Sequence, residues 1–492
     1  MNKIKNFLFT NISIRQTIVK NTFWLGISTT ISRIVRGIVI IYAARILGAE
    51  NYGIFTYAMS LGLIFITFSD IGLSGLLTRE LSKREGADKE SFAATALLLK
   101  LGLIILGIIA TIILGPTVAS FETAKPLMAI IALLLAFDSL RSFVYSISRS
   151  ENKMQTEAGL EIITEVFITV LCLFMLFQNP SAKSLAIGYT IGSGLGLMGA
   201  LVVFRKYIIN ISTKTKNILI KPILGAAWPF AIIGVFSVLM TSIDSVIIGI
   251  YTNTSTLGLY GAAQRPISLL YLVPGFIYTS IFPIMSRLVG NNKNKQISVL
   301  TEKSMTLLSG ISLPIVVGGI ILASPIISVA YGQEFIGSVL TFQILLLTLL
   351  PVFPGMILSN VIFAENKQKV FIKSTLLGAC TNIALDFLLI PIYGIAGSAI
   401  ATFIAQIVMN GILYIEVKKT HNIKILKHLK KITIGTIVMS LLVVILKSYM
   451  IPLLLIIPIS AICFFGLLLI QKEKLITEIK DAFLIKPLDI QK

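Results

Sequence analysis

The chain has 492 residues, of which 55% are hydrophobic and only 13% are charged, and its mean hydropathy is +0.92. A soluble protein carries about 25% charged residues, so the composition excludes a soluble globular domain. The formal net charge of +20 is typical of nucleic-acid-binding proteins. Here, however, the basic residues gather in short connections between apolar runs, and no nucleic-acid partner is expected.

Apolar runs of about 20 residues recur from Asn21 onward, each long enough to cross about 30 Å of hydrocarbon as a helix. The sequence therefore predicts an all-α polytopic membrane protein with about 14 transmembrane helices. In chain order the expected spans are residues 22–44, 52–77, 91–115, 124–148, 155–178, 182–204, 223–250, 257–287, 299–324, 336–363, 369–391, 394–416, 432–449 and 451–471.

The distribution of basic residues predicts how these spans are oriented in the membrane. Lysine and arginine crowd one alternating set of connections and the C-terminal tail. The other set holds only Arg45, Lys125, Lys183 and Lys447. Because cytoplasmic loops carry the excess of lysine and arginine, both termini are predicted to be cytoplasmic. The predicted location is the cell (plasma) membrane, and every external loop is short.

Two short echoes suggest an internal repeat. Glu-Asn-Lys opens the fifth span at 151–153 and the eleventh at 365–367, and Gly53-Ile54-Phe55 resembles Gly258-Leu259-Tyr260. The echoes predict two parallel six-helix halves, with a substrate site between them. The expected domains are an N-terminal tail with the first six-helix bundle (1–204) and a cytoplasmic basic linker (205–222). They are followed by the second six-helix bundle (223–417) and by a C-terminal helix pair with a cytoplasmic tail (418–492).

Arginines inside predicted spans are costly and usually face a cavity or a partner. Arg33 and Arg36 lie one helical turn apart in the first span, and Arg265 lies in the eighth. If the halves face each other, the three arginines would form a positive cavity suited to phosphate, since the guanidinium fork donates two hydrogen bonds at once. The alternative is that each arginine pairs with a carboxylate such as Asp70 or extends to an interface.

Carboxylates also occur in these spans. Asp138 and Arg141 are three residues apart, which predicts a structural ion pair. Glu157, Glu161 and Glu165 are spaced by four residues and therefore share one helix face. The two deeper glutamates either face a cavity or balance the arginines.

A second group of polar residues predicts a cation site. Asn382 and Asp386 share a face of the eleventh span, Ser398 and Thr402 share a face of the twelfth, and Asp244 lies mid-span in the seventh. Carboxylate, amide and hydroxyl oxygens are ligands for a hard cation. Sodium or a proton would suit this set, and the alternative is hydrogen bonding between helices.

Three longer stretches carry a family resemblance: NTFWLGISTTISRIVRGIVIIYAARILGAENYGIFTYAMS, WPFAIIGVFSVLMTSIDSVIIGIY and NIALDFLLIPIYGIAGSAIATFIAQ. They resemble the polysaccharide (lipid-linked oligosaccharide) flippase branch of the multidrug/oligosaccharidyl-lipid/polysaccharide exporter superfamily. The resemblance implies two six-helix bundles in a V plus two extra C-terminal helices. It also implies alternating access that moves polyprenyl-linked oligosaccharides from the cytoplasmic to the outer leaflet.

The resemblance extends to single residues. In the lipid II branch of this superfamily, arginines of the first and eighth spans meet the pyrophosphate, and a sodium site lies on the seventh, eleventh and twelfth spans. The residues that look like counterparts are Arg33, Arg36 and Arg265 for the phosphate, and Asp244, Asn382, Asp386, Ser398 and Thr402 for the cation.

The function predicted is therefore a flippase for surface polysaccharide or glycan assembly, and not an enzyme. Sodium is the candidate coupling ion, and no other cofactor is expected. The expected partners are the polyprenyl-linked glycan, the lipid bilayer, and a glycan polymerase or glycosyltransferases. No G-x-x-x-x-G-K-[ST] run occurs in the sequence, so ATP-driven transport by this chain is not expected.

Three alternatives stay open. A multidrug or cation antiporter of the same superfamily would not need paired arginines in its cavity. A membrane glycan polymerase or ligase would usually need a large external loop, and none is predicted. A scaffold for a glycan-assembly complex would leave the charges inside the spans unexplained.

Overall fold

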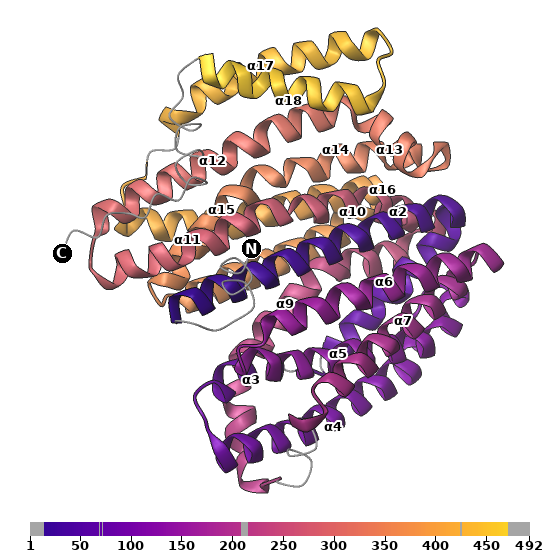
Figure 1. The fold of residues 1–492 in the computed structure, drawn as a ribbon. Coiled ribbons are helices and arrows are strands. Elements are labelled where there is room, and N and C mark those ends of the chain that lie inside the picture. Colours follow the sequence, from indigo (N-terminus) through magenta and orange to yellow (C-terminus); the bar gives the residue numbers. More distant parts are fainter. Residues whose placement is uncertain (1–13, 68, 71, 208–214, 424–425, 471–492) are drawn as a thin grey trace, which may run out of the picture. The chain divides into compact units, whose positions relative to one another are not determined.

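The computed structural model describes residues 14–67, 69–70, 72–207, 215–423 and 426–470 (Figure 1). Within these residues every regular element is a helix. Eleven of the described helices are long and apolar enough to cross a membrane. The predicted class, an all-helical multi-pass membrane protein, is confirmed. Parts of the predicted linker (208–214) and of the predicted tail (471–492) lie outside the described residues.

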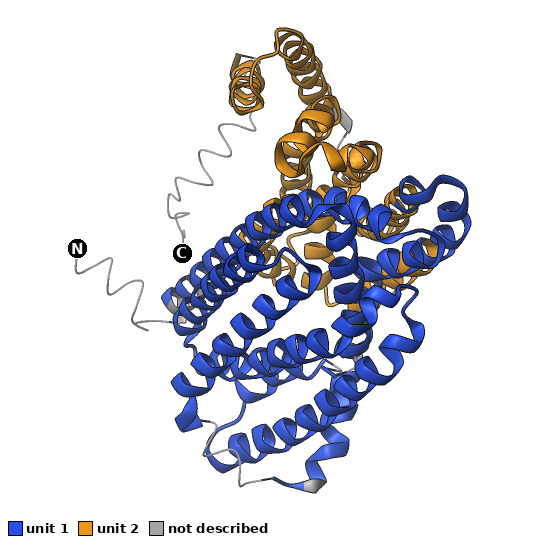
Figure 2. Cartoon of the chain, turned by 90° about the vertical axis from the view of Figure 1, so that its right-hand side faces the viewer, with its two compact units in different colours: residues 1–269, 382–398 blue, residues 270–381, 399–492 orange. Residues whose placement is uncertain are grey.

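The chain forms two compact units, coloured separately in Figure 2. Unit 1 comprises Met1–Leu269 and Asn382–Ser398, and unit 2 comprises Leu270–Thr381 and Ala399–Lys492. The division at 205–222 and 418, which rests on a repeat in the sequence, stays a prediction.

Unit 1 is built from long helices joined by short turns. α6 packs along α7 and α2, and α5 packs along α7 and α4. The helices are α2 (Ile14–Thr67), α3 (Leu73–Leu81), α4 (Gly86–Val118), η1 (Glu122–Leu127), α5 (Met128–Ser150), α6 (Met154–Gln178), α7 (Ala182–Val203), η2 (Asn217–Leu219), α9 (Ile220–Tyr251), α10 (Thr254–Leu270) and the middle of α16 (Gln368–Thr420).

In unit 2, α12 packs against α15 and α17, and α17 packs against α18. The helices are α11 (Leu272–Gly290), α12 (Asn294–Ile321), α13 (Ala323–Tyr331), η3 (Gln333–Ser338), α14 (Val339–Leu347), α15 (Leu349–Ala364), both ends of α16, α17 (Leu426–Ser448) and α18 (Leu453–Ile470). The two C-terminal helices share a core with α12 that includes Met439 and Phe464.

In unit 2, a cluster of ion pairs joins His421, at the C-terminal end of α16, to the turn before the N-terminal end of α16. His421 Nε2 lies 2.6 Å from Glu365 Oε1, and Lys367 Nζ lies 2.9 Å from Glu365 Oε2. Burial alone would raise the pKa of Glu365, but the hydrogen bonds from Lys367 and His421 outweigh burial and hold this pKa below its ordinary value. The contact therefore stabilises the fold at neutral pH, and this contribution is lost as acid protonates Glu365.

Two of the helices contain a kink where the sequence predicts a boundary between spans. α2 bends at Gly48 (φ 71°, ψ 172°), and α16 bends at Gly394 (φ 58°, ψ −138°). Glycine occupies both sites because a side chain is strained at positive φ. α16 thus holds two predicted spans with no loop between them, and α2 holds the first predicted span and part of the second. The total of 14 spans stays a prediction.

The Glu-Asn-Lys echo is a helix-ending turn. Asn152 and Asn366 adopt left-handed backbone conformations, with φ of 55° and 57°. In both turns the lysine amide donates to a carbonyl five residues back, and the asparagine amide donates to one three residues back, as in a Schellman motif. Asn292, which belongs to neither of the two Glu-Asn-Lys motifs, forms the same turn with a φ of 54°. Local turn chemistry therefore accounts for this echo without an internal repeat.

The glycine echo is a different case, because its two glycines meet in unit 1. A Cβ on Gly53 would collide with the backbone carbonyl of Thr254, and a Cβ on Gly258 would collide with that of Ala49. Each carbonyl belongs to the residue four positions before the opposite glycine, so the crossing of α2 and α10 is symmetrical. This symmetry supports the repeat that the sequence suggests.

We expect Gly53→Ala to destabilise the protein by about 1–3 kcal/mol, since a methyl group would push two backbones apart. This cost exceeds the gain of up to about 1 kcal/mol that alanine brings to a helix interior. Thermal unfolding of the purified protein in detergent measures the effect. Gly102→Ala is the control, because nothing lies within 4 Å of a Cβ at Gly102. Equal melting temperatures for the two variants would contradict the close crossing.

Candidate functional site

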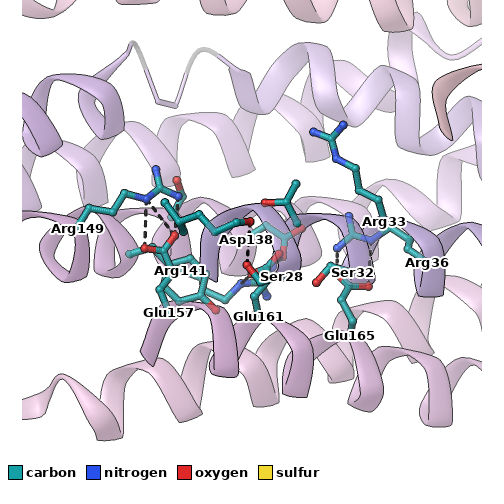
Figure 3. A pocket seen from close by; sticks show the side chains of 14 residues that line it. Ser28, Ser32, Arg33, Arg36, Asp138, Arg141, Arg149, Glu157, Glu161 and Glu165 are labelled. Atoms are coloured by element: carbon teal, nitrogen blue, oxygen red, sulfur yellow. Dashed lines mark hydrogen bonds and ion pairs between the residues drawn. The ribbon is translucent and has the colours of Figure 1, made fainter. Parts of the chain in front are cut away.

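A cavity of about 310 Å³ lies within unit 1 between α2, α5 and α6 (Figure 3). Its lining includes five residues that carry a hydroxyl group, namely Ser28, Thr29, Ser32, Ser142 and Tyr145. Its charged lining side chains are Arg33 and Arg36 from α2, Asp138, Arg141 and Arg149 from α5, and Glu157, Glu161 and Glu165 from α6. Four guanidinium groups therefore face four carboxylates, and the lining is formally neutral.

The three glutamates of α6 form a row along the cavity, as their spacing predicts. Each one contacts an arginine of another helix, and two of the three are almost fully buried, at 3% and 1% exposure for Glu157 and Glu165. The pairs are Glu157 with Arg149 (2.6 Å), Glu161 with Arg141 (4.0 Å), and Glu165 with Arg36. Pairing keeps these charges compatible with a membrane interior.

Arg36 binds Glu165 through two nitrogens. Its Nε lies 3.2 Å from Oε2, and its Nη2 contacts Oε1. The expectation that an arginine pairs with a carboxylate is met here by Glu165, whereas Asp70 binds the fully buried Lys100. The predicted structural pair between Arg141 and Asp138 is also present, at 2.9 Å.

Arg33 differs from the other arginines of the cavity. Its side chain is exposed and forms no ion pair with any residue that the structure describes. Figure 3 shows its guanidinium reaching away from the row of glutamates. Arg33 is therefore available to an anion that enters the cavity.

Arg265, on α10, is half-buried and is not among the residues that line this cavity. Arg36 and Arg265 both lie within electrostatic reach of Tyr189, a buried residue of α7. The structure thus brings Arg33 and Arg36 to one cavity. A shared site for all three arginines stays a prediction.

The predicted cation ligands of unit 1 form a second cluster. Asp244, Asn382, Asp386 and Ser398 are each at most 1% exposed, although they come from α9 and from both sides of the α16 kink. Asp386 lies beside Asp244 and Ser398. Asn382 Nδ2 donates to Asp386 Oδ2 at 3.4 Å.

The composition of this cluster fits a hard cation or a proton. Two neighbouring carboxyl groups without access to water cannot both be charged unless a cation or a proton compensates them. Oδ1 of Asn382 and Oδ1 of Asp386 are buried and accept no hydrogen bond from the described residues. Such oxygens would coordinate sodium, and the carboxyl pair would equally hold a shared proton.

Tyr260 belongs to this cluster, and sequence reasoning missed it. Its hydroxyl donates to Asp244 Oδ2 at 2.5 Å, and the side chain is fully buried. The only signal was its place in the Gly-Leu-Tyr echo, which says nothing about α10 folding back onto α9. Thr402, the remaining predicted ligand, is assigned to unit 2, and its participation stays a prediction.

Family comparisons agree with this architecture. The polysaccharide biosynthesis protein family matches residues 18–289, more than half of the chain, and the MatE family matches residues 229–388. Two similar proteins are flippases of Haloferax volcanii. The probable flippase AglR is 21% identical over 379 residues, covering 76% of this chain and 77% of AglR. The probable low-salt glycan biosynthesis flippase Agl15 is 24% identical over 373 residues, covering 74% and 75%.

A solved structure of the lipid II flippase MurJ, in an inward closed conformation, has the same fold. The TM-score is 0.76 at 22% identity, and the match covers 92% of this chain and 99% of the MurJ chain. At this identity the likeness concerns the fold alone. With the family match over residues 18–289, it shows that the chain belongs to the polysaccharide biosynthesis protein family, the flippase branch of the multidrug/oligosaccharidyl-lipid/polysaccharide exporter superfamily.

Proposed function

We propose that this protein is a flippase that moves polyprenyl-(pyro)phosphate-linked oligosaccharides from the cytoplasmic to the outer leaflet. The observation that carries the proposal is the charged, hydroxyl-lined cavity inside an apolar helical bundle, with the exposed Arg33 beside Arg36. A sugar–phosphate headgroup is too polar to cross hydrocarbon. Arginines that donate to phosphate and hydroxyls that bond to sugar offer this headgroup a polar route.

The relatives support a transporter rather than an enzyme. AglR and Agl15 are named as flippases, and Agl15 is assigned to glycan biosynthesis. We propose that the fold works by alternating access between two six-helix bundles in a V, with 14 spans and both termini in the cytoplasm. A glycan polymerase or glycosyltransferases would act on the same lipid-linked glycan before or after transport.

Cation coupling belongs to the same proposal. Asp244, Asn382, Asp386 and Ser398 would hold sodium or a proton, with Thr402 as a further ligand. A bound cation favours one facing state if its affinity differs between the states. The membrane potential would add about 2.3 kcal/mol per charge per 100 mV.

A second candidate function is export of cationic drugs by exchange with a cation. The match of the MatE family to residues 229–388 favours it, and so do the four carboxylates of the cavity. These carboxylates, however, all lie within 4.0 Å of arginines. The cavity therefore offers a cationic drug no carboxylate that is free of an arginine, whereas it offers an anion the guanidinium of Arg33.

Proteoliposomes with a fluorescent polyprenyl-pyrophosphate sugar test the function. We expect the purified protein to exchange the probe between leaflets at least about tenfold faster than protein-free liposomes, since a polar route lowers the cost of moving the headgroup. A fluorescent cationic dye serves as the comparison substrate. Transport of the dye without transport of the glycan lipid would support the drug exporter and contradict the flippase.

A further inference from the structure

The four arginines that line the cavity of unit 1 differ in their ion-pair partners. Of these four arginines, three contact a glutamate of the α6 row, and Arg33 is the one that forms no ion pair with a described residue. Arg33 lies one turn from Arg36, so the two guanidiniums can reach one ligand from the same helix face. Arg36 is thus the single arginine that has both a carboxylate partner and an unpaired cationic neighbour.

In the ion pair between Arg36 and Glu165, the arginine side chain is partly exposed and the glutamate side chain is buried. The Arg36 side chain is 37% exposed, whereas that of Glu165 is 2% exposed. Glu165 accepts from Nε and Nη2 of Arg36, which leaves Nη1 without a hydrogen bond to any described residue. The guanidinium therefore contacts the carboxylate on one edge and offers another edge to the cavity.

Ser32 lies next to these two arginines in sequence and is one of the residues that line the same cavity. Ser32 is 4% exposed, and its Oγ forms no hydrogen bond with any described residue. A buried hydroxyl without a partner is unfavourable, which points to a ligand group that completes it. A phosphate oxygen between Arg33 and the open edge of Arg36 would do so.

We propose that Glu165 shares Arg36 with the phosphate of the transported lipid and thereby keeps the affinity for this phosphate low enough for release. This inference rests on the proposed flippase function and adds to it a residue that determines affinity. Glu165 holds the Nε edge of Arg36, and the phosphate binds Arg33 and the Nη1 edge. The fixed negative charge of Glu165 opposes the phosphate, as transport requires binding that is reversible in both facing states.

The other pairs of the row lack this arrangement. Arg141 also contacts Asp138 at 2.9 Å and donates to Ser193 at 3.2 Å, and it is only 5% exposed. Arg149 is as exposed as Arg36 and binds Glu157 through two nitrogens, but it has no unpaired arginine one turn away. Glu157 is therefore a matched comparison for Glu165.

Equilibrium binding of geranyl pyrophosphate to the purified full-length protein in detergent tests the inference. We expect Glu165→Gln to bind about tenfold more tightly than the wild type, because a charge that opposes the ligand is removed. In the flipping assay the same variant should show a lower KM and a lower maximal rate. Glu157→Gln should tighten binding less, and binding of uncharged geraniol should not change in either variant.

Glu80→Gln is a control outside the cavity, where Glu80 contacts Arg79 at 3.0 Å, and its affinity should equal that of the wild type. Binding of geranyl pyrophosphate to Glu165→Gln that is equal to or weaker than wild-type binding would overturn the inference. Equal tightening by Glu157→Gln would also overturn it, by assigning the effect to the total charge of the cavity.

Glu165→Gln leaves Arg36 without its partner, so the double variant R36Q/E165Q serves if the single variant does not fold. It replaces the ion pair by two neutral amides and should bind geranyl pyrophosphate at least about tenfold more weakly than the wild type. Unchanged binding would show that the pair is structural. No binding by wild type or variant would refute the proposed function as well, whereas wild-type binding without tightening refutes only this inference.

Discussion

Arg33→Ala is expected to reduce leaflet exchange of the polyprenyl-pyrophosphate sugar by about 10- to 100-fold. Hydrogen bonds to a charged group contribute about 1.5–3 kcal/mol each, and Arg33 is the arginine of the cavity that carries no carboxylate partner among the described residues. Since the Arg33 side chain is exposed, its removal leaves no buried group unpaired. The fold of the variant should therefore stay intact. The exchange assay in proteoliposomes measures the effect.

Two further variants sharpen this result. Arg33→Lys keeps the charge but loses the two-pronged geometry, so partial activity is expected. Arg45→Ala removes an exposed arginine of the same helix that does not line the cavity, and it should transport normally. Normal exchange by Arg33→Ala would mean that the phosphate does not enter this cavity.

Asp386→Asn is expected to abolish the stimulation of exchange by a sodium gradient. Asp386 is fully buried and lies beside Asp244 and Ser398. Replacing one of two carboxylates removes half of the negative charge that a bound cation neutralises. Leaflet exchange with and without a sodium gradient, in wild type and variant, is the measurement.

Two comparison variants test whether the sodium effect belongs to this cluster. Tyr260→Phe removes the hydrogen bond to Asp244 and should weaken the sodium effect without eliminating it. Asp88→Asn, on the exposed first turn of α4, should leave it unchanged. Sodium-dependent exchange that persists in Asp386→Asn would return Asn382 and Asp386 to a role in helix packing.

The membrane class and most helix positions follow from the sequence, because they depend on local properties. An apolar run of about 20 residues must become a helix in lipid, since its backbone cannot otherwise be hydrogen-bonded there. For this reason α4, α5, α6 and α7 begin and end within about five residues of the predicted spans. The second span differs from the prediction: it is divided between α2 and α3, where Gly72 takes a left-handed conformation.

The sequence also determined which residues carry charge inside the membrane and which of them share a helix face. It left the contact of Glu165 with Arg36 as one of several pairings, because the two residues are 129 positions apart. The partner of Asp70, the place of Arg33 among paired arginines, and the contact of Tyr260 with Asp244 were decided by the tertiary structure. The physical reason is that a helix period fixes direction along one element, whereas a contact between elements depends on how whole helices pack.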